Sequence, residues 1–173
     1  MQLVRCFVLL LALTACGDSP VTSDAGSDSG SGDAPAPCQG PCATTNLTAT
    51  FQATRMLDSA YYGVTFDTNN LHVEAYRRGG TGCPTMSSPT PDYTLVLGEV
   101  SPTQPMSNLA TANILDFKGD LLGGPLGVAA TQVKIDRTAG EAAMFIALDV
   151  MLTFQQGTVA GHLYATHCDS LDN

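Results

Sequence analysis

LTATFQAT, residues 47–54, alternates strictly between apolar and polar side chains. A period of two residues is typical of a β-strand that buries one face and exposes the other. This stretch therefore predicts a half-buried strand and an all-β domain around it. The side chains expected to face the core are Leu47, Ala49, Phe51 and Ala53, and those expected to face solvent are Thr48, Thr50, Gln52 and Thr54.

Further segments of the same character follow, and turn-forming residues separate them. Asp67-Thr68-Asn69-Asn70 supplies residues that tolerate left-handed backbone, so it predicts a hairpin between the strands beside it. Residues 136–140 predict another turn. About eight short strands predict an antiparallel β-sandwich or small barrel. Besides 47–54, the expected strands are 60–66, 71–76, 93–100, 114–117, 127–135, 142–154 and 158–167.

The longest apolar segment is AAMFIALDVMLTF, residues 142–154. Its length would allow a helix, but turn signals at both ends favour a central strand. Asp149 interrupts the apolar run. A buried carboxylate is costly unless it is paired, so we expect either a β-bulge near Asp149 or an outward-facing side chain.

The start of the chain has the pattern of an export signal. Arg5 precedes an apolar run, Cys6–Leu13, that is too short to cross a bilayer. Leu13-Thr14-Ala15-Cys16 follows, and it resembles the lipobox of bacterial lipoproteins. The resemblance implies cleavage before Cys16, a diacylglyceryl group on its thiol and attachment to the lipid bilayer. The alternative is an ordinary secretory signal in which Cys16 is incidental.

The resemblance also bears on location, because in lipoproteins an aspartate directly after the lipidated cysteine retains the protein at the inner membrane. Gly17 occupies that position here, which favours the outer membrane of the cell envelope. The expected organisation is a signal peptide at 1–15, the lipidated cysteine and a flexible Gly/Ser/Asp/Pro linker at 16–37, and one β domain at 38–173. The linker composition cannot bury enough apolar surface to fold.

The chain is acidic, with a net charge of −9. Removal of residues 1–15 takes away one arginine, which leaves six Lys/Arg against sixteen Asp/Glu and a net charge of −10. An acidic chain without basic clusters argues against nucleic acid and anionic lipid headgroups as partners. Arg77-Arg78 is the one adjacent basic pair, and we interpret it as a solvated strand end.

Six cysteines, less Cys6 in the signal and Cys16 in the lipobox, leave Cys38, Cys42, Cys83 and Cys168. An even number in an exported chain predicts two disulfides, with three possible connectivities. We favour Cys38–Cys42 together with Cys83–Cys168, and the alternatives pair each early cysteine with a distant one. Structural zinc is disfavoured, because an oxidising compartment consumes thiolates.

Motifs that would indicate catalysis are absent from the sequence: it has no G-x-S-x-G, S-x-x-K or H-E-x-x-H. His162 and His167 are five residues apart on one expected strand, so they point to opposite faces. Oxygen-rich turns at 67–70, 116–120 and 169–173 could bind Ca²⁺, but none has the EF-hand pattern. We predict no catalytic residue, metal or cofactor.

The function expected from these observations is that of a membrane-anchored exported lipoprotein whose domain is a non-enzymatic surface or binding module. Its protein or glycan partner is not indicated by the sequence. Two alternatives remain at this point, a small periplasmic hydrolase with an unrecognised site and a Ca²⁺-dependent adhesive domain.

Overall fold

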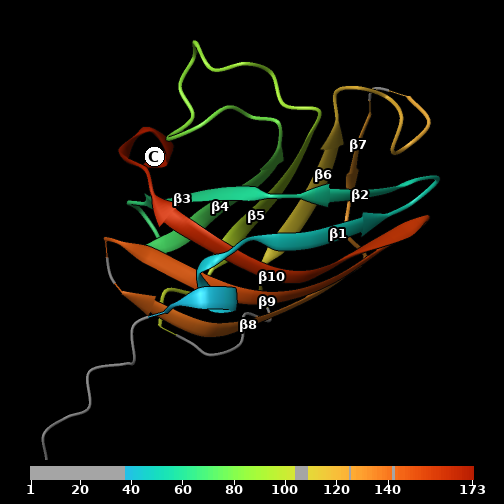
Figure 1. The fold of residues 1–173 in the computed structure, drawn as a ribbon. Coiled ribbons are helices and arrows are strands. Elements are labelled where there is room, and N and C mark those ends of the chain that lie inside the picture. Colours follow the sequence, from blue (N-terminus) through green and yellow to red (C-terminus); the bar gives the residue numbers. More distant parts are fainter. Residues whose placement is uncertain (1–37, 104–108, 125, 142) are drawn as a thin grey trace, which may run out of the picture. The chain divides into compact units, whose positions relative to one another are not determined.

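The structure is a computed structural model, and it describes residues 38–103, 109–124, 126–141 and 143–173 (Figure 1). The expected signal peptide at 1–15, Cys16 and the linker at 16–37 lie outside the described residues. Everything below concerns the domain that follows them.

Ten strands form one mixed sheet that does not close on itself, and the described residues contain no α-helix. The all-β prediction is confirmed, the closed barrel is not formed, and ten strands replace the expected eight. The strands are β1 (Asn46–Thr50), β2 (Thr54–Leu57), β3 (Ser59–Thr65), β4 (Asn70–Arg77), β5 (Tyr93–Val100), β6 (Thr111–Asp116), β7 (Leu126–Ala129), β8 (Gln132–Glu141), β9 (Phe145–Phe154) and β10 (Gly157–His167); short 3₁₀ turns are η1 (Gly40–Ala43) and η2 (Asp169–Leu171).

Strand β10 joins the two layers of the molecule. Residues 157–166 of β10 pair with β9 along one edge. Along the other edge, residues 158–162 pair with β1 and residues 166–167 pair with β3. The β10–β3 pair is parallel, whereas all other pairs are antiparallel, so the sheet is mixed and not purely antiparallel as expected. Because β1 and β3 share one edge of β10, β8–β9–β10–β1–β2 lies across β3–β4–β5–β6–β7 (Figure 1).

The core lies between these layers and follows the alternation seen in the sequence. Leu47 and Ala49 are fully buried, whereas Thr48 and Thr50 on the same strand face outward. The opposite layer buries Leu95 and Leu97 in the same way. Residues from all of the strands except β7 belong to one contiguous buried cluster, so the sandwich has a single core.

The predicted strand 47–54 is wrong beyond Thr50. The Phe51 N–H donates to the Ala53 carbonyl at 3.0 Å, so the chain reverses there and β2 runs back along β1. The Phe51 ring packs against Phe154, with centroids 5.3 Å apart. The reversal places Leu57 opposite Leu47, and both are buried. The apolar/polar alternation continues through the turn, so the sequence pattern did not indicate that the chain reverses there.

Three further predictions are corrected in β7, β8 and β9. The expected strand 127–135 divides into β7 and β8, and the expected turn at 136–140 lies within β8. The bulge expected near Asp149 is absent, because β9 pairs with β10 without interruption from Phe145 to Phe154. A register shift occurs instead in β8, between Arg137 and Ala139.

The structure contains the favoured pair of disulfides. Cys38–Cys42 links a residue just before η1 to a residue within it, with the Cα atoms 5.3 Å apart. Cys83–Cys168 links the long loop after β4 to the end of β10, and it joins residues 85 positions apart. The β3–β4 hairpin expected around residues 67–70 is also present, with Asn69 in the left-handed region at φ 55°.

Candidate functional site

The last six residues, Cys168–Asn173, lie along β3, and we call them the strap. The Cys168 N–H donates to the Tyr62 carbonyl at 2.8 Å. Further on, the Asn173 N–H donates to the Val64 carbonyl at 3.2 Å, and the Phe66 N–H donates to the Asn173 carbonyl at 2.7 Å. These backbone bonds cover part of the β3 edge and continue the parallel pairing that β10 begins.

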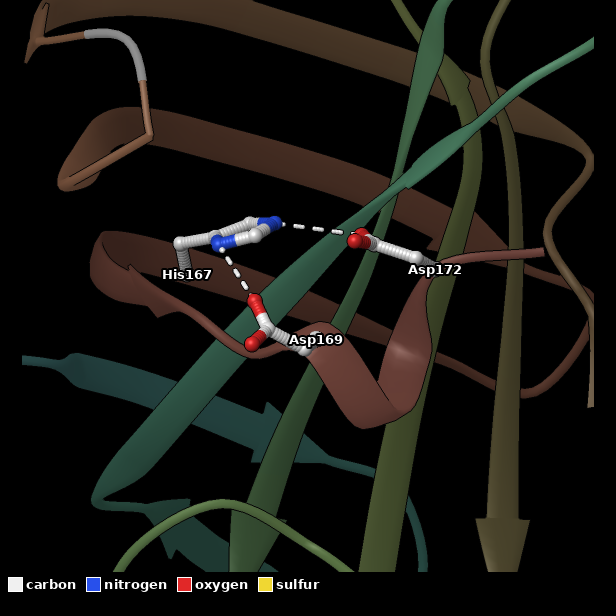
Figure 2. Close-up of side chains that lie close together, drawn as sticks. All are labelled: His167, Asp169 and Asp172. Carbon is white, nitrogen blue, oxygen red and sulfur yellow. Dashed lines mark hydrogen bonds and ion pairs between the residues drawn. The ribbon is translucent and has the colours of Figure 1, made fainter.

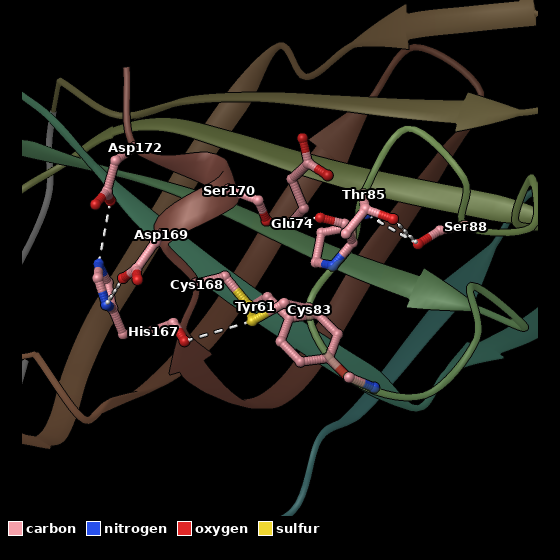
Figure 3. The surroundings of a disulfide bond; sticks show 12 residues. Tyr61, Glu74, Cys83, Thr85, Ser88, His167, Cys168, Asp169, Ser170 and Asp172 are labelled. Carbon is pink, nitrogen blue, oxygen red and sulfur yellow. Dashed lines mark hydrogen bonds and ion pairs between the residues drawn. A yellow bond between two sulfur atoms is a disulfide. The ribbon is translucent and has the colours of Figure 1, made fainter.

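The strap also holds the loop of residues 79–92, as Figure 3 shows around the Cys83–Cys168 disulfide. The Ser170 hydroxyl donates to the Pro84 carbonyl at 2.6 Å. On the other side of the disulfide, the Gly82 N–H donates to the Tyr61 hydroxyl at 2.9 Å. One covalent bond and two hydrogen bonds therefore attach this loop to the strap and to β3.

Within the loop, residues 85–88 form a compact turn. The Ser88 N–H donates to the Thr85 carbonyl at 3.0 Å, and the Thr85 N–H donates to the Ser88 hydroxyl at 2.9 Å. Between them, the Met86 side chain is fully exposed. We call the loop 79–92 and the strap together the stapled face.

A cluster of three titratable groups lies at the root of the strap (Figure 2). His167 Nδ1 lies 3.4 Å from an Asp169 oxygen, and His167 Nε2 lies 3.1 Å from Asp172 Oδ1. The imidazole packs on the Tyr62 ring at a centroid distance of 5.2 Å. A hydrogen bond from the Val64 N–H, together with the His167 ring, lowers the pKa of Asp172 despite partial burial.

These three side chains offer one imidazole and two carboxylates within 4.8 Å of one another, which is a possible donor set for a metal ion. However, each ring nitrogen of His167 faces a different carboxylate. Since one ion can bind only one of the two nitrogens, metal binding would break one of these contacts. The arrangement as it stands fixes the orientation of the imidazole and fastens the strap.

A second polar group lies on the outer face of β4. His72, Glu74 and Tyr76 alternate along the strand and therefore share one face. His72 Nε2 lies 2.8 Å from Glu74, and the Tyr76 hydroxyl donates to the other carboxylate oxygen. Burial would raise the pKa of Glu74, but these two hydrogen bonds outweigh it and the pKa is lowered. Burial and the adjacent Glu74 carboxylate raise the pKa of Tyr76.

A third polar cluster joins β2 to the loop after β6. The Asp120 carboxylate accepts from the Tyr93 hydroxyl and contacts Lys118 at 3.0 Å and Arg55 at 3.3 Å. The Tyr93 hydroxyl, then Lys118 and Arg55, lower the pKa of Asp120 to about 2. The donors and acceptors of this cluster satisfy one another, so its role is structural.

The oxygen-rich turns expected as possible Ca²⁺ sites have other uses. Asp116 is 1% exposed, and its carboxylate accepts backbone N–H groups from Gly119, Leu121 and Leu122 at 2.6–2.8 Å. Both oxygens are thus occupied by the loop that Asp116 itself organises. The turn at 67–70 connects β3 to β4, and the segment 169–173 forms most of the strap.

The histidines are all placed against acidic groups. His162 and His167 point to different faces of β10, as expected, and His162 Nδ1 lies 2.8 Å from the exposed Asp149. The other His162 nitrogen lies 2.9 Å from the Cys42 carbonyl. With His72 against Glu74, every histidine of the chain contacts a carboxylate.

Sequence reasoning identified Cys83 and Cys168 but missed the side chains that surround them. The alternation in the expected strand 71–76 places His72, Glu74 and Tyr76 on one face, but it does not indicate that their side chains contact one another. Asp172 was noted only within the oxygen-rich segment 169–173, and its partners Val64 of β3 and His167 of β10 were not expected. The two adjacent arginines end β4 and pair with Asp58 and Asp92, in agreement with a solvated strand end.

Comparison of the chain with protein-family models, with curated proteins and with solved structures finds no match. Within the described ranges, no helix is long and apolar enough to cross a membrane.

Proposed function

We propose that this protein is an exported lipoprotein, anchored in the cell envelope through acylated Cys16, whose β domain is a non-enzymatic binding module. The observation that carries the proposal is the lipobox pattern Leu13-Thr14-Ala15-Cys16 directly behind a short apolar run. Two acyl chains or more hold a protein firmly in a bilayer, whereas one holds it only marginally. Gly17 after the cysteine supports the outer membrane as the destination.

The remaining cysteines support the same compartment. Disulfides persist in exported proteins and are rare where glutathione keeps thiols reduced. Both Cys38–Cys42 and Cys83–Cys168 have ordinary Cα separations, 5.3 and 5.6 Å. A flexible segment of the length of residues 17–37 spans about 25 Å, which would hold the domain clear of the lipid surface.

The stapled face is the surface that best supports binding. Loops held on a rigid scaffold are common positions for binding residues. Here a disulfide and two hydrogen bonds fix the loop that carries the exposed Met86. The chain carries a negative net charge, which disfavours an anionic polymer as the partner and leaves a protein or a glycan.

Metabolic labelling with an alkyne-modified palmitate, in a Gram-negative host that expresses the full chain, tests the anchor. We expect label on the wild type and none on Cys16→Ser. The matched control is Cys6→Ser, which removes a thiol from the same segment but keeps the lipobox, and it should label like the wild type. Equal labelling of Cys16→Ser, or an unmodified Cys16 thiol in the intact mass of the exported protein, contradicts the anchor.

Oxidative footprinting tests the binding face, because the molecule exposes methionines on two different surfaces. Met86 lies on the stapled face, and Met151 is exposed on the outward side of β9. With the full chain in its own envelope fraction, we expect slower oxidation of Met86 and an unchanged rate at Met151. Equal rates with and without the envelope fraction, or turnover of ester, peptide or glycoside substrates, would favour the hydrolase alternative.

A further inference from the structure

A pocket of about 300 Å³ lies beside β3, β4, β8 and β9. Its apolar wall consists of Tyr62, Val64, Leu71 and Ile146, which come from β3, β4 and β9. Arg137 of β8 contributes a positive charge to the same pocket. Apolar walls with one or two placed polar groups are the usual composition of a small-molecule site.

Arg137 differs from the other cationic side chains of the domain. The chain has seven lysines and arginines, and all of them except Arg5 lie in the described residues. Five of these six side chains have a nitrogen 3.0–3.6 Å from a carboxylate oxygen. Arg137 is the exception among these six, because its guanidinium donates to the backbone carbonyl of Pro102. Among the described residues, this is the one cationic side chain with no carboxylate oxygen within 4.0 Å, and it lines a pocket.

The backbone is shaped around this side chain. A Cβ atom added at Gly140 would lie 2.5 Å from Arg137 Nη2 and 2.9 Å from its Nε. The glycine therefore leaves the space in which the guanidinium lies across β8. The register shift of β8 falls between Arg137 and Ala139, directly before Gly140. Pro102 and Gly140 together hold the cation in place without neutralising it.

We propose that this pocket binds a small aliphatic monocarboxylate, with the carboxylate on Arg137 and the alkyl chain against Tyr62, Leu71 and Ile146. A guanidinium recognises a carboxylate through paired N–H···O bonds. The pocket contains one cation, and Glu141 lines the same opening, so a second negative charge on the ligand would be repelled. A volume of 300 Å³ holds about ten water-sized atoms at ~30 Å³ each, which matches a chain of about eight carbons.

This inference goes beyond the anchored binding role, since it needs neither acylation of Cys16 nor the stapled face. The two proposals can therefore fail separately. Loss of palmitate labelling leaves the pocket untouched, and an empty pocket leaves the anchor untouched.

Octanoate labelled with ¹³C at its carboxyl carbon is a direct probe, observed by NMR during titration of the full chain with Cys16→Ser. We expect saturable binding at one site. Octanol, which has the same chain length without the charge, should bind about tenfold more weakly, because a charge-assisted bond is lost. Equal affinity for octanol and octanoate, or no saturable shift of the carboxyl signal, overturns the proposal.

Two variants locate the binding. Arg137→Gln removes the cation, and Gly140→Ala displaces the guanidinium, so each should weaken octanoate binding about tenfold or more. The matched control is Lys134→Gln, which removes the same charge from the same strand at an exposed side chain paired with Asp136. Unchanged binding in Arg137→Gln, or an equal loss in Lys134→Gln, contradicts the assignment. If Arg137→Gln fails to fold, the comparison of octanoate with octanol on the parent chain still decides.

Discussion

The backbone of Leu171 crosses Gly63 so closely that a Cβ atom at position 63 would lie 2.2 Å from the Leu171 carbonyl carbon. Because of this close approach, the backbone of η2 packs directly against the backbone of β3. The approach also sets the distance at which Asp172 reaches the Val64 N–H, 2.7 Å. The strap, the His167 cluster and the disulfide at Cys168 therefore all depend on the absence of a side chain at one position in β3.

Gly63→Ala should destabilise the domain by about 1–3 kcal/mol, because the added methyl group must displace the Leu171 backbone. Equilibrium unfolding in guanidinium chloride measures the loss. Amide exchange at Asn173, which donates to the Val64 carbonyl, should become faster in the same variant.

Gly124→Ala is the matched control. A Cβ atom added at Gly124 would lie 4.0 Å from its nearest neighbour, the Leu126 Cγ atom. The φ of Gly124 is outside the left-handed region. We expect a change in stability below about 0.5 kcal/mol. Equal losses at positions 63 and 124 would show that the close contact with Leu171 does not restrain the strap.

The two disulfides should contribute unequally to stability. In the chain-entropy model, a link between residues 85 positions apart stabilises by about 4.5 kcal/mol, whereas a separation of 4 gives about 2 kcal/mol. The double variant Cys83→Ala/Cys168→Ala should therefore lose more stability than Cys38→Ala/Cys42→Ala, as measured by denaturant unfolding. The reverse order would mean that η1 carries more of the fold than its few contacts indicate.

Asp172 should make the free energy of unfolding depend on pH in the acidic range. Its pKa is lowered in the folded state from the ordinary value of 3.8, first by the Val64 N–H and then by His167. A lowered pKa contributes stability above pH 3.8, and this contribution is lost as the pH falls through the lower, folded value. Asp172→Asn should consequently be less stable than the wild type at pH 6 and closer to it below pH 3.

The control for this prediction is Asp169→Asn. Asp169 contacts the same imidazole, but its side chain is 97% exposed, so its removal should have little effect at any pH. Thermal unfolding between pH 2.5 and 7 distinguishes the two variants. An Asp172→Asn curve parallel to that of the wild type would contradict the role of this carboxylate.

Asp116→Asn should cost about 2–4 kcal/mol, because an amide NH₂ would face backbone donors that the carboxylate now accepts. The matched control is Asp136→Asn, an exposed acid paired with Lys134, for which we expect a loss below about 1 kcal/mol. Thermal unfolding with and without Ca²⁺ adds a second readout. A Ca²⁺-dependent rise in Tm that Asp116→Asn abolishes would show that residues 116–120 bind the ion after all.

Local patterns were sufficient for much of the fold. The alternation in 47–50 and in 71–76 correctly places Leu47, Ala49 and Val73 in the core, because a pleated strand sends successive side chains to opposite faces. The turn at 67–70 was equally visible, since Asn tolerates the left-handed conformation that Asn69 adopts.

The same patterns failed where the alternation ran through a change of direction. Phe51 and Ala53 continue the period of β1, yet the chain reverses between them to pair β2 with β1. Asp136 and Gly140 look like a turn but lie in β8, since pairing with β9 provides the hydrogen bonds that local preference cannot.

The candidate sites were still less accessible from the sequence. The guanidinium of Arg137 donates to the carbonyl of Pro102, which lies 35 positions away in the sequence. Asp172 reaches Val64 across 108 positions. Contacts of this range have no local period, and backbone donors and acceptors are the same at every residue.

By itself, the order of residues determined that this chain forms two-faced strands and that four cysteines lie in the domain at 38–173. These properties depend on side-chain type and spacing over a few neighbours. Only the tertiary structure decided that β10 pairs in parallel with β3, that the strap lies over Gly63 and that Arg137 donates to the carbonyl of Pro102. Those outcomes follow from which strand edges meet when the core closes, and edge pairing uses backbone groups that are common to all residues.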